Sequence, residues 1–461
     1  MTHRVGLLLA SVALLASCSG DGRRPENVII VSIDTLNRDA LRAFDPDAPE
    51  LPALDEFSRQ ALKFVRAHST ASWTLPAHGS LLTGLYPDRH GAVHRETMLA
   101  PEVATLAEKL AETGLQTVAF TDGGYLASNY GMTRGFDRYD TRRPSGKAWS
   151  GPSIPRRGAS NKVRGATLFD RGIAFLEGRE PSSDGFFLFL HTYVVHDYFR
   201  LHSWALDRLP ARANESRKTY SRCLRGERRC APAAWHRLKA LYEAELHRLD
   251  EGFAALLAAL DEKGLRESTL LIVVSDHGEG FQPERGRIHH GGRLHEDQIR
   301  IPFLVAGPGI PPGVSERPVS LVDVMPTVLE LMGCDAVPDL DGRSLAEALR
   351  GGDRGPARPL LAMEHYYRWH DGRRGTTPLS DRALSMAVVR EDDWYVHWED
   401  GEELYDMVRD SEQSHNLSAS AGITEPFREL VRAREVFRPT APAVTLDEAL
   451  REQLQSLGYI D

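Results

Sequence analysis

The sequence predicts an α/β fold in which a mostly parallel sheet is covered by helices on both faces. Three observations support this prediction. Runs rich in valine, isoleucine, leucine and phenylalanine recur along the chain, helical segments lie between them, and one of those segments is a long amphipathic helix. The chain has 461 residues, 41% hydrophobic and 26% charged, which is the composition of a globular protein with a sizeable core.

The predicted strands are continuous apolar runs. Strands of a parallel sheet are buried on both faces, so nearly every side chain in them is apolar. The predicted strands cover Asn27 to Asp34, Thr117 to Asp122, Phe186 to Tyr193, Thr269 to Asp276, and Ile301 to Ala306.

The clearest predicted helix precedes the run that ends at Asp276. Its apolar residues recur at intervals of three and four, which places them on one face against the core. Gly264 follows the pattern and is expected to help end the helix. The apolar face consists of Leu238, Leu241, Tyr242, Leu246, Leu249, Phe253, Leu256, Leu257 and Leu260.

The net charge argues against a protein that binds nucleic acid. Lysine and arginine number 56 and aspartate and glutamate 65, so the formal net charge is -9. Proteins that bind the phosphate backbone of nucleic acids carry a basic surface. We therefore expect no nucleic-acid partner, while a local cationic pocket for a small anion stays compatible with the composition.

The N-terminal residues have the features of a secretory signal peptide. Arg4 precedes the apolar run Val5 to Leu15, which is too short to span a membrane in the mature protein. The following Leu15-Ala16-Ser17-Cys18 resembles a bacterial lipobox, which implies that residues 1–18 form a lipoprotein signal peptide and that Cys18 is acylated. Residues 19–26 then form a short tether. The alternative is ordinary cleavage that leaves Cys18 without a role.

A lipid anchor at Cys18 would attach the protein to a membrane of the bacterial cell envelope. Ser19 follows the cysteine, where an aspartate would argue for retention in the inner membrane. We therefore expect the outer membrane, with the protein facing the periplasm or the cell surface. An exported protein can form disulfides, and Cys223 and Cys230 are predicted to pair, because no further cysteine or histidine at ligand spacing supports a metal site there.

Two predicted strands end on an aspartate, Asp34 and Asp276. In an open α/β sheet, ligands bind at the carboxyl ends of the strands, where such side chains converge. His277 and Gly278 follow Asp276, so an oxygen and a nitrogen ligand stand side by side. The alternative for each acid alone is a helix cap or a turn residue.

The segment from Ser72 to Gly84 indicates a loop that enters a short helix. Pro76 suits the first turn of a helix. Thr74 lies near the expected N-terminus, where free N–H groups and the helix dipole stabilise a sulfate or phosphate group. The alternative is that Thr74 only caps the helix.

Four segments, in this order, resemble the signatures of the sulfatase family within the alkaline-phosphatase superfamily. The resemblance extends from about Asn27 to Tyr459 and implies an alkaline-phosphatase-like, mostly parallel sheet sandwiched by helices, with a smaller C-terminal antiparallel sheet. The segments are Asn27 to Leu36, Thr74 to Gly84, Ser275 to Phe281, and Glu403 to Asp406.

The resemblance implies one divalent metal ion held by Asp34, Thr74, Asp276 and His277, with Thr74 as the nucleophile. Such an ion would orient the ester oxygen and lower the pKa of the threonine hydroxyl. Oxygen-rich ligation with one imidazole suits calcium, magnesium, manganese or zinc.

The same resemblance assigns roles to four further histidines. His290 aligns with the family position that binds the substrate anion. His196 aligns with the histidine that assists the leaving group, although Asp197 stands where the family usually has a proline. His78 occupies the position of the family's arginine and is assigned to substrate binding, as is His191, for which a structural role is the equal alternative.

The largest departure from the family is the nucleophile. Sulfatases oxidise a cysteine or serine to formylglycine, and the extra methyl group of Thr74 blocks that conversion. Relatives that use threonine directly act on phosphate esters, and a phospho-threonine can be resolved by water or an acceptor hydroxyl. We therefore expect a formylglycine-independent hydrolase of a sulfate or phosphate ester, with the chemistry favouring phosphate.

The predicted substrate is a small anionic ester or a glycan or lipid of the cell envelope. Two alternatives stay open. One is a phosphoryl transferase acting on an envelope lipid or glycan. The other is a non-catalytic surface lipoprotein that binds an anionic glycan or a protein partner.

The predicted catalytic domain covers residues 27–350, and a C-terminal α+β subdomain covers residues 351–461. Leu384 to Val389 and Trp394 to Trp398 resemble short strands, and Asp400-Gly401 a hairpin turn. Nearby aromatic residues, namely Tyr366, Tyr367 and Trp369, are expected to pack against the protein.

Overall fold

The structure is a computed structural model, whose large sheet has the strand order β10-β2-β9-β6-β1-β5-β3-β4. Its neighbouring strands are parallel, except that β9 runs antiparallel to β2 and β6. The strands are β1 (Asn27–Ile33), β2 (Leu62–His68), β3 (Gln116–Thr121), β4 (Arg138–Thr141), β5 (Phe186–Thr192), β6 (Thr269–Ser275), β9 (Phe303–Ala306) and β10 (Gly313–Ser320). The structure describes residues 24–141, 168–180, 184–200, 223, 232–282, 287–352, 358–364, 385–398, 401–420, 422–435, 443–444 and 447–456.

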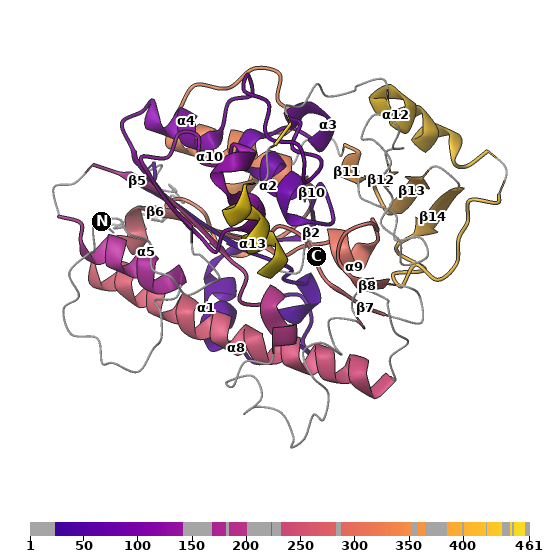
Figure 1. Ribbon diagram of the computed structural model, residues 1–461, viewed down its shortest axis with the longest axis horizontal. Helices are drawn as coiled ribbons and strands as arrows, with labels where there is room; N and C mark the ends of the chain where they lie inside the picture. The colour runs from indigo at the N-terminus through magenta and orange to yellow at the C-terminus, as the bar shows by residue number, and fades with distance from the viewer. Residues whose placement is uncertain are drawn as a thin grey trace, which may run out of the picture.

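Helices cover both faces of this sheet, as predicted (Figure 1). Side chains of β1 alternate between two cores: Val28 and Ile30 pack on one face, and Ile29, Val31 and Ile33 on the other. The first face is covered by α2 (Thr74–Thr83), α4 (Leu106–Ala111), α10 (Val324–Met332) and α13 (Glu448–Ser456). The second is covered by α1 (Pro52–Gln60), α5 (Leu168–Glu177) and α8 (Pro232–Glu262).

The predicted amphipathic helix is α8, and Gly264 ends it as expected. Gly264 has a φ of 65°, in the left-handed region that glycine adopts at little cost. The amide of Leu265 reaches back to the carbonyl of Leu260 at 2.9 Å, which is the hydrogen bond of a helix that closes on a left-handed residue.

The sheet differs from the predicted one at its β10 edge and at β9. The run from Ile301 to Ala306 forms β9, but this strand is antiparallel to both neighbours, whereas the prediction made it parallel. The strands β2, β4 and β10 were missed. Each of them contains partly exposed residues, and such strands lack the continuous apolar run that marks the central ones.

A second, antiparallel sheet forms the C-terminal part, as predicted. It has the strand order β11-β12-β13-β14 and carries helix α12 (Glu425–Glu435) against it (Figure 1). Trp398 pairs with Gly401, so the chain reverses at the predicted hairpin, with Gly401 already in the second strand. The strands are β11 (Leu360–Glu364), β12 (Ser385–Arg390), β13 (Asp393–Trp398) and β14 (Gly401–Asp406).

Several predictions fall on residues outside the described part of the chain. Cys223 is buried and forms a disulfide, but its predicted partner Cys230 is not among the described residues. Cys18 and its signal peptide also lie outside them, as do the three aromatic residues Tyr366, Tyr367 and Trp369. Within the described ranges, no helix is both long enough and apolar enough to cross a membrane.

Candidate active site

The two strand-end aspartates meet at one edge of the large sheet. Strands β1 and β6 are parallel neighbours in register, with Ile33 opposite Ser275, so the chain leaves both strands at the same level. Asp34, Asp276 and His277 each place a ligand atom within 4.8 Å of those of the other two, and all three side chains are fully buried. We call these three residues the strand-end group.

The turn after β1 is strained and is held from two sides. Thr35 has a φ of 59°, which is rare for a β-branched residue and is typical of functional sites. Its amide donates to Oδ1 of Asp276 at 3.3 Å, and its carbonyl accepts from the hydroxyl of Tyr242 on α8 at 2.9 Å. The strained turn thereby orients Asp276 from the neighbouring strand.

His277 presents one nitrogen to the two acids. Its Nδ1 lies 3.0 Å from the carbonyl oxygen of Gly278, and because a carbonyl only accepts, Nδ1 carries the proton. Nε2 then faces Asp276 Oδ2 at 3.4 Å and Asp34 Oδ1 at 3.9 Å. Gly278 must be a glycine here, since a Cβ atom would lie 2.2 Å from the carbonyl oxygen of Asp297.

Thr74 points its hydroxyl at the strand-end group. Oγ1 of Thr74 donates to Oδ2 of Asp34 at 3.1 Å. Trp73 occupies the N-cap position of α2, so Thr74 is the first helical residue and not the cap. Pro76 is the third helical residue and has no N–H, which leaves the amides of Thr74 and Leu75 as the early donors of the first turn.

The strand-end group has the properties of a cation site. Asp34 Oδ1, Asp276 Oδ2 and His277 Nε2 are buried and have no hydrogen-bond partner among the described residues. In the same part of the chain, the basic side chains within 4 Å of the two carboxylates are histidines. Buried carboxylates without a strong partner are costly and commonly coordinate a metal. The donor set of two carboxylates, one hydroxyl and one imidazole therefore fits a divalent cation.

The two acids are affected differently by their surroundings. Burial and then the charge of Asp34 raise the pKa of Asp276 well above its ordinary value. Burial also acts to raise the pKa of Asp34, but hydrogen bonding to His191 and the charges of nearby histidines outweigh burial and hold its pKa far below the usual range. Asp34 is therefore the member of the pair that stays ionised.

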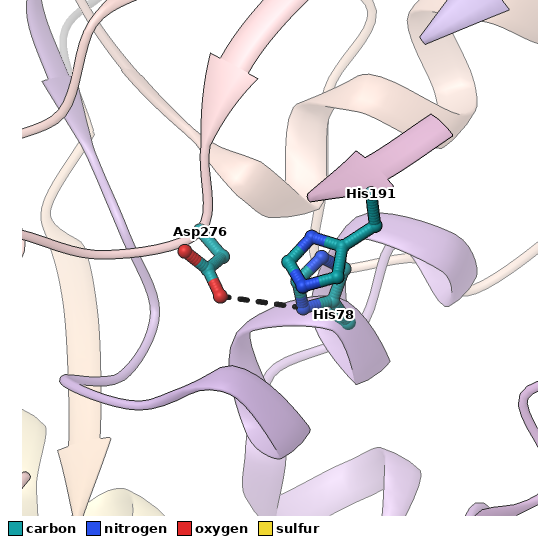
Figure 2. Close-up of side chains that lie close together, drawn as sticks. All are labelled: His78, His191 and Asp276. Carbon is teal, nitrogen blue, oxygen red and sulfur yellow. Dashed lines mark ion pairs between the residues drawn. The ribbon is translucent and has the colours of Figure 1, made fainter. Parts of the chain in front are cut away.

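His78 and His191 lie beside Asp276 (Figure 2). Nδ1 of His78 donates to the carbonyl oxygen of Thr74 at 2.8 Å, and Nε2 lies 2.9 Å from the hydroxyl of Ser32. Burial and then His191 hold the pKa of His78 well below its usual value, so the ring is neutral. Both nitrogens of His78 are thus engaged within the protein, and its substrate contact stays a prediction. His191 lies 3.5 Å from Asp34 Oδ2, and its substrate role stays a prediction.

His196 and His290 lie next to each other, with ring centres 5.2 Å apart, and the ring of His290 is 4.7 Å from that of His277. Burial lowers the pKa of His196, but Asp197 and Asp34 outweigh burial, so its pKa lies above the ordinary value. Burial lowers the pKa of His290 to about 3. The structure thus brings both histidines to the strand-end group, while their catalytic roles stay predictions.

Glu279 is a site residue that the sequence reasoning missed. Its side chain is fully buried and contacts Nδ1 of His290 at 3.0 Å and Nδ1 of His289 at 3.3 Å. It stands in the segment Ser275 to Phe281, two residues after His277, and an acid at that spacing was the available signal.

Comparison with known proteins gives the family. A model of the sulfatase family matches residues 26–334. The Multifunctional alkaline phosphatase superfamily protein PehA of Trinickia caryophylli is 27% identical over 85% of this chain and 91% of that protein. The Delta 4,5-hexuronate-2-O-sulfatase of Bacteroides thetaiotaomicron is 24% identical over 88% of this chain and 87% of its own length.

A solved structure of another hydrolase shares the fold. The phosphonate monoester hydrolase of Agrobacterium radiobacter superposes with a TM-score of 0.71 at 18% identity, covering 90% of this chain and 96% of that one. The family match spans more than half of the chain. The matched residues include the strand-end acids and the helix that begins at Thr74. The chain therefore belongs to the sulfatase family of the alkaline phosphatase superfamily.

Proposed function

We propose that this protein is a metal-dependent hydrolase that attacks a phosphate or phosphonate ester directly with Thr74. The observation that carries the proposal is the 3.1 Å hydrogen bond from the Thr74 hydroxyl to Asp34, inside a buried group of two acids and one imidazole. Among the similar proteins, two are called phosphonate monoester hydrolases and others are sulfatases, so both ester classes are compatible with the fold.

The residues that would hold the cation are Asp34, Thr74, Asp276 and His277. When bound, a divalent cation supplies a Lewis acid that lowers the pKa of the threonine hydroxyl and polarises the ester oxygen. Asp34 by itself orients the hydroxyl but is a weak base for it, since its pKa lies far below the usual range.

The reaction would proceed in two displacements. Oγ1 of Thr74 gives its proton to a solvent water and forms a bond to phosphorus, while the bond from phosphorus to the leaving alcohol breaks. His196, whose pKa is raised, gives its proton to the departing oxygen. Water then attacks the phosphorus and gives its proton to His196, while the bond between phosphorus and Oγ1 of Thr74 breaks. Thr74 regains its proton from solvent, and the phosphate or phosphonate is released.

The preference for phosphorus over sulfur rests on the side chain of Thr74. A threonine cannot be converted to the aldehyde through which formylglycine sulfatases eliminate sulfate. A phospho-threonine needs no such elimination, because water can attack the phosphorus directly. Attachment to the outer membrane through Cys18 is part of the same proposal and would place an envelope glycan or lipid within reach of the site.

The test offers matched aryl phosphate, aryl phosphonate monoester and aryl sulfate substrates to the wild type and to Thr74→Ala and Thr74→Ser. We expect phosphorus esters to be turned over fastest, about 10³-fold loss or more in Thr74→Ala, and activity retained in Thr74→Ser. Dominant sulfate turnover would contradict the phosphorus preference. Equal turnover in the wild type and Thr74→Ala would end the enzyme proposal and favour the non-catalytic alternative.

A further inference from the structure

The chain that leads into α2 is held by two segments that are distant in the sequence. Residues 70–73, which we call the lead segment, lie between β2 and α2 and belong to neither. The amide of Met363 on β11 donates to the carbonyl oxygen of Thr70 at 2.8 Å. The amide of Gly291 donates to the carbonyl oxygen of Ser72 at 2.9 Å. The position of the lead segment is therefore set by contacts with the small sheet and with the loop that contains Gly291.

Glu364 adds a side-chain contact to this arrangement. The hydroxyl of Ser72 donates to Oε2 of Glu364 at 2.5 Å. Ser72 is fully buried, and Glu364, the last residue of β11, is 3% exposed. A hydrogen bond that is buried in this way is stronger than the same bond in water. It ties a side chain of the lead segment to the end of a strand of the small sheet.

The carboxyl group of Glu364 is surrounded by uncharged groups. Burial raises its pKa from 4.5 to about 7, and hydrogen bonds from Ser72, Gly292 and Trp73 only partly oppose this. The carboxyl group is therefore neutral at pH 6. A buried acid among uncharged groups lowers stability, and acids of this kind are concentrated at functional sites. Its contacts with the lead segment indicate which function it has.

The start of α2 is not fixed by a capping side chain. Trp73 is the N-cap residue, and its side chain forms no capping hydrogen bond, whereas serine, threonine, aspartate or asparagine usually forms one. The backbone of Trp73 is extended, with φ −158° and ψ 163°. The direction in which the chain enters the helix therefore depends on the contacts of the lead segment. Thr74, the first helical residue, follows that direction.

We propose that Glu364 is a positioning residue for Thr74, which acts through the hydroxyl of Ser72 and makes the small sheet part of the active site. The inference rests on the proposed function, because it concerns the placement of the nucleophile. Oγ1 of Thr74 lies 3.1 Å from Oδ2 of Asp34. A displacement of about 1 Å from the productive position can lower a rate by about 10²-fold. Because Ser72 is two residues from Thr74, loss of its hydrogen bond displaces the nucleophile.

The kinetic test compares Glu364→Ala, Glu364→Gln and Ser72→Ala with the wild type at pH 6, with an aryl phosphate as substrate. We expect kcat to fall by about 10²-fold in Glu364→Ala and by about tenfold in Ser72→Ala, with KM changed by less than about threefold. Glu364→Gln keeps a neutral side chain that accepts the hydrogen bond from Ser72, so its kcat should stay within about twofold of the wild type.

A second measurement reads the lead segment without using activity. Hydrogen-exchange mass spectrometry follows a peptide that covers residues 69–75 in the same proteins. We expect exchange in this peptide to be about tenfold faster in Glu364→Ala than in the wild type, and unchanged in Glu364→Gln.

Asp250→Ala is the matched control for a loss of stability alone. Asp250 is a buried acid on α8, and its carboxylate accepts from the amides of Ala53 and Leu54 at 3.2 Å and 2.8 Å, at the start of α1. Its removal should lower the stability of the protein but leave kcat and the exchange of the 69–75 peptide within about twofold of the wild type. Urea unfolding checks that each variant is folded. If Glu364→Ala does not fold, Ser72→Ala, which removes the same hydrogen bond, takes its place.

The outcomes separate this inference from the proposed function. A kcat of Glu364→Ala within about threefold of the wild type would overturn the positioning role and leave the proposed function intact. An equal loss of kcat in Asp250→Ala, or no recovery in Glu364→Gln, would also overturn it. Equal turnover in the wild type and Thr74→Ala would contradict the proposed function instead. In that case, faster exchange in Glu364→Ala alone would support the hold of Glu364 on the lead segment, and unchanged exchange would overturn it.

Discussion

Two buried groups share Asp276 but differ in what they can bind. The strand-end group adds Asp34 and His277, and the group drawn in Figure 2 adds His78 and His191. In each group the candidate atoms lie within 4.8 Å of one another, and every side chain is fully buried. Proximity and burial therefore do not distinguish them.

The difference lies in which nitrogen atoms are already used. Nδ1 of His277 donates a hydrogen bond to the carbonyl oxygen of Gly278, and the lone pair of Nε2 faces the two carboxylates. This arrangement is usual for a metal-binding histidine. Nδ1 of His78 donates a hydrogen bond to the carbonyl oxygen of Thr74, and Nε2 is within hydrogen-bond distance of the Ser32 hydroxyl. A ring with both nitrogens engaged is part of the support of a site, whereas a ring with one available lone pair can be a ligand.

The largest expected effect comes from His277→Gln, which removes the available lone pair. We expect the strand-end cation to be lost and kcat/KM for an aryl phosphate to fall by about 10³-fold, because several kcal/mol of transition-state stabilisation come from such a cation. Metal analysis and steady-state kinetics on the same preparation check this. Turnover within tenfold of the wild type would show that His277 is not a ligand.

A smaller effect is expected from His78→Gln, which tests the other side of the comparison. The strand-end cation should be retained, since His78 offers it no lone pair. Turnover should fall by about tenfold, and the free energy of unfolding by about 1–3 kcal/mol, because the first turn of α2 loses a buried hydrogen bond to Thr74. Urea unfolding measures the stability. Loss of the cation in this variant would mean that His78 is a ligand and that the distinction fails.

The smallest effect on turnover is expected from Glu364→Gln. Glu364 is buried and belongs to the small antiparallel sheet, outside both histidine groups. Glu364 on β11 accepts a hydrogen bond of 2.5 Å from Ser72, two residues before Thr74. Burial raises its pKa from 4.5 to about 7, although the hydrogen bond from Ser72 opposes this. Turnover at pH 6 should stay within about twofold of the wild type, because the side chain is neutral in both proteins.

The pH dependence of stability gives the sharper readout for Glu364. Since its pKa is higher in the folded state, the stabilisation is fully present below pH 4.5 and is lost as the pH rises through about 7. The loss in the wild type should be at most about 3 kcal/mol, and Glu364→Gln should lack it. Urea unfolding at pH 5 to 8 measures the difference. Parallel curves for the two proteins would contradict the raised pKa.

The central strands could be predicted because a strand buried on both faces consists almost entirely of apolar residues. Strands β1, β5 and β6 are buried on both faces and read as continuous apolar runs. Strand β10, at the edge of the sheet, contains exposed residues and was missed. The direction of β9 could not be predicted either, because the same apolar run suits a parallel or an antiparallel strand and the path of the connecting chain decides between them.

The meeting of Asp34 and Asp276 was determined by the sequence itself, since acids that follow buried parallel strands leave the sheet at the same edge. Only the tertiary structure decided which side chains around them can act. Whether His78 or His277 keeps a lone pair depends on hydrogen bonds to Ser32, Thr74 and Gly278. The contacts of Glu279 with His289 and His290 likewise depend on the pairing of β7 (Gly280–Gln282) with β8 (Arg287–His289). Such contacts arise from packing between distant segments, and no local pattern of residues encodes them.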